Sequence, residues 1–403
     1  MSAGRKIRWK ASIARRGLSA ILLTTLIIPV FNSNIFAQAA DKEANPTQLH
    51  GGIEIDPDGI KAAVIRVFDN AQGVGTEVIY SEIFNTALTR TQDGKVSPEA
   101  IKAACQAIQK FYTLIRQQRG VPPRQVHVIG SSELNPGNLE ELTNEVKNIT
   151  GAGITFLDLK TEAQLSVIGT VPRRYREGGT WFDNRSHSIV FDIGSYKTKG
   201  GYQQLRQPLV GDPFYEFVPV DISIGAIRFT DEVNKAAGED AGISKFAVNA
   251  RSLSENSIKT ALRNEIQRRP GLAYRKKIYL NGAIVGAMMT LLHPEDRQPF
   301  IPITIEDINS FYQLAVSSPQ SLLNPNLARI RNDEVRKEVE KELEEVKSAF
   351  TSKSLLAGAL ILKAMSSECN FQEEGKKLLY ARFSNMGVIL SYLLLQAGEG
   401  PQP

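Results

Sequence analysis

Along the chain, segments in which apolar residues alternate or form short runs are followed by segments in which they recur at helical spacing. This succession predicts strands followed by helices. Short apolar or alternating runs, typical of strands, occupy residues 51–56, 60–68, 75–84, 126–130 and 154–159. Helical spacing of apolar residues predicts helices over residues 98–116, 139–149 and 161–169. Ser97 and Asn138 are the expected N-caps of the first two helices. This succession is typical of an α/β domain with a mixed sheet.

The same order occurs a second time in the later part of the chain. Residues 171–184, rich in Gly, Arg and Pro, are interpreted as a surface connection. A new strand-rich set begins near His187, its meander runs from Gly200 to Ile224, and helices dominate afterwards. We therefore expect two similarly built domains that face each other across a cleft.

A highly charged segment, residues 331–347, is also predicted to be a helix. Its apolar residues form a narrow stripe of Val335, Val339, Leu343 and Val346. A solvated helix face is the favoured interpretation, and docking of a partner is the alternative.

The first 39 residues are typical of a secretory signal. Six basic residues precede an apolar stretch at 18–31, and Ala37-Gln38-Ala39 follows as a cleavage site. The apolar stretch is shorter than the roughly 20 residues of a membrane span. We expect an exported protein, periplasmic or extracellular, with a polar linker at 40–50. An uncleaved anchor is the alternative, and Arg15-Arg16 leaves the twin-arginine route open.

Removal of this signal would change the charge of the chain. The full sequence carries +5, but residues 1–39 hold six Lys and Arg and no acidic residue, so the remainder carries −1. No basic field then remains to attract nucleic acid or a membrane surface, and no membrane span is expected in the mature chain. Cys105 and Cys369 are too few for a disulfide framework. Two buried thiols are favoured over one bridge, which an oxidising compartment would permit.

Two strand–turn–strand signatures carry the candidate chemistry. The first runs from Gly52 through Asp56-Pro57-Asp58-Gly59 to Val67, and the second runs from Ile189 through Asp192 to Gly201. Each has an acidic residue near the end of an apolar run, then a short polar turn and another extended run. The Asp-Pro-Asp-Gly sequence is favoured as a plain turn, and a divalent-cation site is the alternative.

The four histidines do not suggest a metal site. They are scattered along the chain without ligand spacing, at His50, His127, His187 and His293. Zinc binding is therefore not expected.

Paired in this way, the two hairpins resemble the phosphate-binding hairpins of the actin, sugar-kinase and Hsp70 superfold. Further segments resemble, in order, those of the exopolyphosphatase and guanosine pentaphosphate phosphohydrolase (Ppx/GppA) family, namely residues 128–138, 150–156, 162–169, 223–230 and 356–362. The resemblance covers most of residues 51–395. It implies two ribonuclease-H-like, actin-like domains with mixed sheets flanked by helices, domain I at 51–180 and domain II at 185–380. An apolar helix at 383–397 is expected to pack back on domain I.

The resemblance also implies a phosphohydrolase that acts on polyphosphate or a related phosphoanhydride. Glu162 takes the position of the family's proposed base. Asp192 takes the position that holds Mg²⁺ directly or through water, with Glu54 and Asp56 as further metal ligands from the first hairpin. Phosphate contacts are expected at the turn positions Gly59, Gly194, Ser195, Lys197 and Thr198.

The first turn departs from the family pattern. Pro57 has no N–H to donate, and Asp56 and Asp58 would set two carboxylates against an anionic substrate. At an effective dielectric constant of 20, one unit repulsion at 4 Å is about 4 kcal/mol.

The second turn departs as well. Tyr196 stands where a glycine is expected, and Lys197 and Lys199 replace a serine and a glutamate. The two lysines are predicted to share one strand face, where they either replace lost N–H donors with point charges or form a solvated surface.

Two functions therefore remain open. One is an exported hydrolase that removes terminal phosphates from polyphosphate or a related polyanion with Mg²⁺. The other is a catalytically degenerate relative that binds polyphosphate or phosphate, or acts as a scaffold. A homodimer is an open alternative for its assembly.

Overall fold

The computed structural model describes residues 48–57, 59–70, 73–86, 88, 96–134, 139–172, 174–177, 180–183, 185–208 and 212–398. The expected signal peptide, most of the expected linker, Asp58 and Asn138 lie outside these residues. No helix among the described residues is both long enough and apolar enough to cross a membrane.

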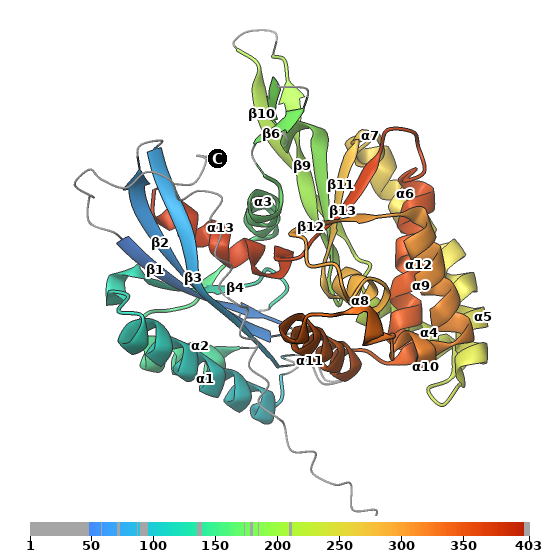
Figure 1. The fold of residues 1–403 in the computed structure, drawn as a ribbon, viewed down its shortest axis with the longest axis horizontal. Helices are drawn as coiled ribbons and strands as arrows, with labels where there is room; N and C mark the ends of the chain where they lie inside the picture. Colours follow the sequence, from blue (N-terminus) through green and yellow to red (C-terminus); the bar gives the residue numbers. More distant parts are fainter. Residues whose placement is uncertain are drawn as a thin grey trace, which may run out of the picture.

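Two mixed β-sheets covered by helices form the body of the protein (Figure 1). The first sheet has the order β3-β2-β1-β4-β5, with β1 antiparallel to β2 and parallel to β4. Its strands are β1 (Gln48–Asp56), β2 (Gly59–Asn70), β3 (Gly73–Asn85), β4 (Val126–Gly130) and β5 (Thr155–Phe156).

Helices cover both faces of this first sheet, because alternate residues of a strand point to opposite faces. Ile53, Ile55 and Val64 share a core with α1 (Pro98–Thr113) and α2 (Glu140–Thr150). On the other face, Ile65 and Val67 share a core with α13 (Gly387–Gln396). We call the sheet with these three helices the first lobe.

The second sheet repeats the topology of the first. Its order is β10-β9-β8-β11-β13-β12, again with two antiparallel pairings followed by two parallel ones, and with β12 added antiparallel to β13 at the edge. Its strands are β8 (Ser188–Ile193), β9 (Thr198–Arg206), β10 (Phe214–Ile222), β11 (Lys277–Asn281), β12 (Phe300–Ile303) and β13 (Lys377–Ala381). The repeat confirms the prediction of two similarly built sheets.

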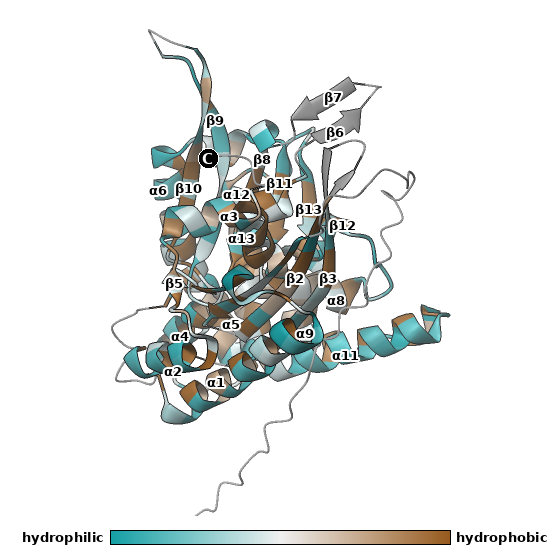
Figure 2. Ribbon diagram, turned by 90° about the vertical axis from the view of Figure 1, so that its left-hand side faces the viewer, coloured by the Kyte–Doolittle hydropathy of each residue, from teal (hydrophilic) through white to brown (hydrophobic). Residues whose placement is uncertain are grey.

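Helices of the second lobe follow β10 in the chain and pack around its sheet. They are α4 (Ala226–Ala237), α5 (Ile243–Leu253), α6 (Lys259–Arg268), α7 (Gly271–Tyr274), α8 (Ala283–Leu292), α9 (Ile305–Ser317), α10 (Pro319–Leu322), α11 (Asp333–Ala349) and α12 (Ser352–Glu368). Figure 2 shows α11 as largely hydrophilic. Its Val339, Leu343 and Val346 are buried, so the predicted amphipathic helix is confirmed.

Helix α3 (Leu159–Thr170) joins the two lobes. It packs against α13 on one side and against β8, β9 and β10 on the other. The approach to α13 is close, since a Cβ placed on Gly169 would lie 2.3 Å from the backbone oxygen of Gly387. Glycine at this position therefore lets α3 sit between the sheets, with its first turn facing the ends of both central hairpins.

Several local predictions need correction. A second small hairpin, β6 (Arg174–Glu177) and β7 (Thr180–Asp183), stands where a surface connection was expected. The strand predicted over 154–159 shrinks to two residues, because α3 begins at Leu159 with Asp158 as its N-cap. Helix α2 has Leu139 at its N-cap position, not Asn138. The Ser97 cap is confirmed.

The cysteine prediction is also answered by the structure. Cys105 and Cys369 are both free thiols, and Cys369 is buried. The prediction of two separate thiols is confirmed, but burial is confirmed only for Cys369, because Cys105 is half-buried.

Candidate functional site

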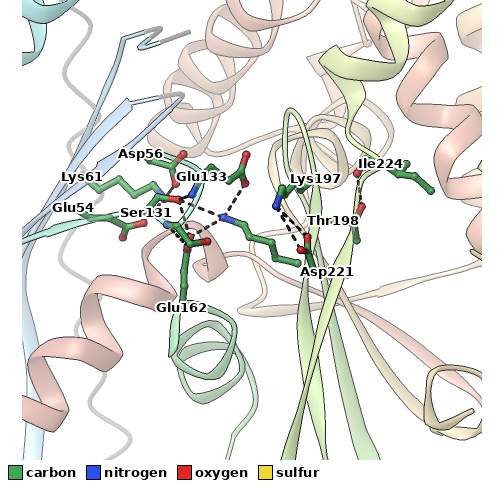
Figure 3. A network of polar contacts seen from close by, with 12 residues as sticks. Glu54, Asp56, Lys61, Ser131, Glu133, Glu162, Lys197, Thr198, Asp221 and Ile224 are labelled. Atoms are coloured by element: carbon green, nitrogen blue, oxygen red, sulfur yellow. Dashed lines mark hydrogen bonds and ion pairs between the residues drawn. The ribbon is translucent and has the colours of Figure 1, made fainter. Parts of the chain in front are cut away.

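Charged residues from four parts of the chain meet between the two lobes (Figure 3). The β1–β2 hairpin, the loop after β4, the first turn of α3 and the β8–β9 hairpin each contribute to this set. We call it the interlobe cluster, and it consists of Glu54, Asp56, Lys61, Ser131, Ser132, Glu133, Glu162, Asp192 and Lys199. The structure thus brings Glu162, Asp192, Glu54 and Asp56 together in one region.

Lys199 lies at the centre of this cluster. Its Nζ is 2.8 Å from Glu133 Oε1 and 2.7 Å from Glu162 Oε1. None of these three side chains is more than 9% exposed. Because β9 belongs to the second sheet while Glu133 follows β4 of the first, the two ion pairs connect the lobes. The alternative of a solvated strand face is therefore wrong for Lys199.

Glu162 has no free oxygen to act as a base. Its Oε1 accepts hydrogen bonds from Lys199 Nζ at 2.7 Å and from Ser131 Oγ at 3.0 Å, and its Oε2 accepts one from the Ser132 N–H at 2.6 Å. Burial opposes its ionisation, but Lys199 and the Ser132 hydrogen bond outweigh burial and hold the pKa of Glu162 below its usual range. A carboxylate with a low pKa and three donors is a weak proton acceptor.

The first hairpin contains a second internal ion pair. Lys61 Nζ lies 2.9 Å from Glu54 Oε1 and 3.0 Å from Asp56 Oδ2. Burial raises the pKa of Glu54 to about 7, although Lys61 opposes the shift. Gly59 lies directly opposite Asp56 in the β1–β2 pairing, and a Cβ there would lie 2.7 Å from the backbone oxygen of Phe84. Close strand packing is therefore a sufficient reason for glycine at this turn position.

In the turn between β8 and β9, the polar groups form hydrogen bonds with other groups of the protein. The Gly194 N–H donates to the Lys197 carbonyl at 2.9 Å, and Thr198 Oγ1 donates to the Ile224 carbonyl at 2.8 Å. The Gly194 and Ser195 carbonyls accept from the first N–H groups of α4. Since carbonyl oxygens occupy these helix N-terminal donors, the donors are not directed at an anion.

The two lysines of the second hairpin have different partners. Lys197 is about one third exposed, and its Nζ lies 3.4 Å from Asp221 Oδ1, whereas Lys199 is buried against Glu133 and Glu162. The two lysines therefore differ in environment, since Lys197 is partly exposed beside Asp221 and Lys199 is buried between two carboxylates.

The residues expected to hold Mg²⁺ do not fit that ion. Glu54 and Asp56 both contact the ammonium group of Lys61. Burial raises the pKa of Asp192, while the nearby Lys199 and Lys61 oppose the shift. Within the described ranges, no group of three or more His, Cys, Asp or Glu residues is arranged to hold a metal ion. The ammonium groups of Lys61 and Lys199 contact the carboxylates that would otherwise be available to Mg²⁺.

Comparison with solved structures gives the fold a name. A Ppx/GppA family member from Aquifex aeolicus is 15% identical, with a TM-score of 0.55 over 87% of this chain and 99% of that chain. The chain has the Ppx/GppA fold. An exopolyphosphatase from Cytophaga hutchinsonii is 13% identical, with a TM-score of 0.56 over 86% of this chain and 98% of that chain. An exopolyphosphatase-like protein is 15% identical, with a TM-score of 0.57 over 86% and 99% of the two chains.

These comparisons confirm the predicted fold class, two actin-like domains with mixed sheets flanked by helices. No protein-family model matches the sequence, and a search of curated proteins found no match. At 13–15% identity the likeness shows the Ppx/GppA fold and leaves the chemistry to the residues.

Sequence reasoning missed four participants in the cluster. No role was assigned to Lys61, Ser131, Ser132 and Glu133, although the last three lie in a segment that resembles the Ppx/GppA family. The only local signal was a charged residue directly after a buried strand, where Glu133 follows β4. Nothing local indicated that Lys199 would reach it, since the two residues lie in different lobes.

Proposed function

We propose that this Ppx/GppA-fold protein does not hydrolyse phosphoanhydrides and serves as a non-catalytic binding or scaffold protein. One observation carries the proposal, the contact of Lys199 Nζ with both Glu133 and Glu162. The residue that would orient a water molecule is already paired with a buried cation of the same chain.

The charge balance of the interlobe cluster supports the same conclusion. Its five carboxylates face two ammonium groups, and the contacts of these ammonium groups described above are all with carboxylates or Ser131. A phosphate entering here would meet carboxylates before free cations. One unrelieved repulsion at 4 Å is about 4 kcal/mol at an effective dielectric constant of 20, or roughly three decades in affinity.

The same ion pairs suit a structural role. A buried pair that loses one partner leaves an uncompensated charge, so separation of the lobes at Lys199 would be costly. The interlobe cluster therefore favours a fixed relation between the lobes, which a scaffold needs and a cycle of opening and closing does not.

The decisive experiment compares phosphate release from long-chain polyphosphate by the protein without residues 1–39 and by its Glu162→Gln variant, both with Mg²⁺. An active exopolyphosphatase serves as the assay control. We expect no release from either form. Release that disappears in Glu162→Gln would overturn the proposal. Retardation of polyphosphate on a gel without release would identify the binding role, and absence of retardation would identify the scaffold.

The second candidate is an exported hydrolase of polyphosphate or a related phosphoanhydride, with Glu162 as base. The observation that favours it is a fold shared over 98% of the length of an exopolyphosphatase. It requires Lys199 to leave Glu162 when substrate enters. Glu162→Gln separates the two candidates, since the substitution abolishes phosphate release in this case, whereas in the other neither form releases phosphate.

We further propose export, on the signal-like pattern of residues 1–39. Expression of the full chain in a bacterial host, followed by mass measurement, should give a mature protein that begins at Ala40. A full-length product in the membrane fraction would instead identify an uncleaved anchor.

A further inference from the structure

A cavity at the other end of β1 has chemistry that differs from the interlobe cluster. It has a volume of 530 Å³, and we call it the histidine pocket, lined by Gln48, His50, Arg124, Gln125, His127 and Gln396. His50 lies near the start of β1 and Asp56 at its end, so about 20 Å of strand separates the pocket from the interlobe cluster.

The strand register explains why two histidines distant in sequence meet here. His127 of β4 lies opposite Gly52 of β1, and His50, two residues before Gly52, points to the same face. The two rings are nearly parallel, with an interplanar angle of 8° and centroids 6.5 Å apart. Gly52 adds no side chain between them, and a Cβ there would lie 2.5 Å from Ile389 Cδ1 of α13.

Helix α13 closes the pocket from above the sheet. Tyr392 stands edge-on to the ring of His127, with centroids 5.8 Å apart. Gln396 follows one helical turn later and therefore lies on the same side of the helix. Arg124 comes from the short turn Pro123–Gln125 that precedes β4.

His50 is the unusual member of this set. It is 4% exposed, and neither Nδ1 nor Nε2 has a hydrogen-bond partner within the described part of the chain. A neutral imidazole offers one donor and one acceptor, and each buried group left unpaired is destabilising. Buried polar groups are therefore almost always paired in native proteins. An external partner in the pocket would satisfy this histidine.

The lining residues indicate which partner fits. None is acidic, Arg124 offers five N–H donors, and each of the three glutamine amides offers two. Two imidazoles without a third ligand are a poor metal site. A set of donors around one cation instead suits an oxyanion, which accepts charge-assisted hydrogen bonds.

We propose that the histidine pocket binds a phosphate-class oxyanion through Arg124, His50, His127 and the surrounding glutamine amides. The titratable or charged groups that face it are His50 of β1, His127 of β4, Arg124 of the preceding turn and Tyr392 of α13. This site is independent of the proposed function, because the interlobe cluster contributes no residue to it.

Binding should be linked to proton uptake. Burial lowers the pKa of His50 and of His127, so both are largely neutral at pH 8 when the pocket is empty. An anion nearby favours the protonated ring, and the affinity should therefore increase as the pH falls.

The test uses the histidine ring resonances in NMR, because the chain has only four histidines. Inorganic phosphate is titrated into the protein without residues 1–39, with sodium chloride of matched ionic strength as the control, and tripolyphosphate in a second series. We expect saturable shifts for His50 and His127, none for His187 and His293, and tighter binding at pH 6 than at pH 8. Tighter binding of tripolyphosphate would point to a polyphosphate end, and equal or weaker binding to free phosphate.

The exposed Arg124 provides the matched variant, since Arg124→Ala should not disturb folding. Loss of its charge-assisted hydrogen bonds should weaken phosphate binding by about tenfold or more. No response of His50 and His127 to millimolar phosphate would overturn the proposal. Shifts that sodium chloride reproduces, or that Arg124→Ala leaves unchanged, would overturn it as well. So would a saturable response to Zn²⁺ without one to phosphate.

Discussion

The interlobe cluster and the histidine pocket lie at opposite ends of β1, and they differ in whether their central buried side chains have hydrogen-bond or ion-pair partners. In the interlobe cluster, buried Lys199 is held by two carboxylates and Glu162 by three donors. In the histidine pocket, buried His50 has no partner on either ring nitrogen among the described residues. Glu54 Oε2 is the exception in the interlobe cluster, since it is buried without a partner among the described residues. The ammonium groups at the site with the sequence resemblance are thus all paired with carboxylates, whereas both ring nitrogens of His50, in a region without any motif, have unmet hydrogen-bonding capacity.

The largest effect on stability is expected when Lys199, the central cation of the interlobe cluster, is removed. Lys199→Met leaves Glu133 and Glu162 buried without a counter-charge, and we expect a loss of about 3–5 kcal/mol in the free energy of unfolding. Lys197→Met is the matched control on the same hairpin. Its side chain is about one third exposed, so the loss should be below about 1 kcal/mol. Denaturant unfolding measures both, and equal losses would show that Lys199 is not a special structural centre.

A second test concerns how firmly α3 holds Glu162 in place. Gly169→Ala puts a Cβ against the backbone of Gly387, and overpacking of this kind costs about 1–3 kcal/mol. Gly153→Ala is the control, because a Cβ there meets no atom within 4 Å. Thermal unfolding of the two variants should differ clearly. Similar melting temperatures would mean that α3 can shift away from α13 without cost.

Protonation of Glu133 in the interlobe cluster should make the stability of the protein depend on pH. Burial raises the pKa of Glu133 from 4.5 to about 7. Between these values the folded protein keeps a proton that the unfolded chain has released, so stability falls as the pH rises through this window. In Glu133→Gln that fall should become shallower by up to about 1.4 kcal/mol per pH unit.

Denaturant unfolding at several pH values between 4.5 and 8 checks this expectation. Glu340→Gln, at an exposed position of α11, is the control and should keep the wild-type slope. A slope unchanged in Glu133→Gln would mean that Glu133 is ionised throughout this range.

The smallest effect is expected at the histidine pocket. His50→Leu removes two unpaired buried nitrogens and keeps a similar volume, so the stability without ligand should change by less than about 1 kcal/mol in either direction. Phosphate should raise the melting temperature of the wild type and not of the variant, because a ligand stabilises only the state that binds it. A large loss of stability in phosphate-free buffer would show that His50 is already satisfied.

Much of the fold could be predicted from local pattern. The strand at Val126–Gly130 and the helix that starts after Ser97 follow directly from apolar periodicity and capping. The β6–β7 hairpin was missed, because Gly, Arg and Pro in residues 171–184 hide the strand pattern. For the candidate site, the sequence indicated Glu54, Asp56, Glu162 and Asp192, which the structure brings together, but it indicated neither Glu133 nor the ion pairs of Lys199.

Local patterns were enough to predict the periods, the turns and the repeated order of strands and helices, because these depend on neighbours a few residues apart. The folded structure was needed to show that Lys199 binds Glu133 and Glu162, and that His50 lies beside His127 without a partner among the described residues. Such contacts depend on strand register and on how α3 fits between the sheets. Those are set by packing across the whole molecule, which no local stretch of sequence encodes.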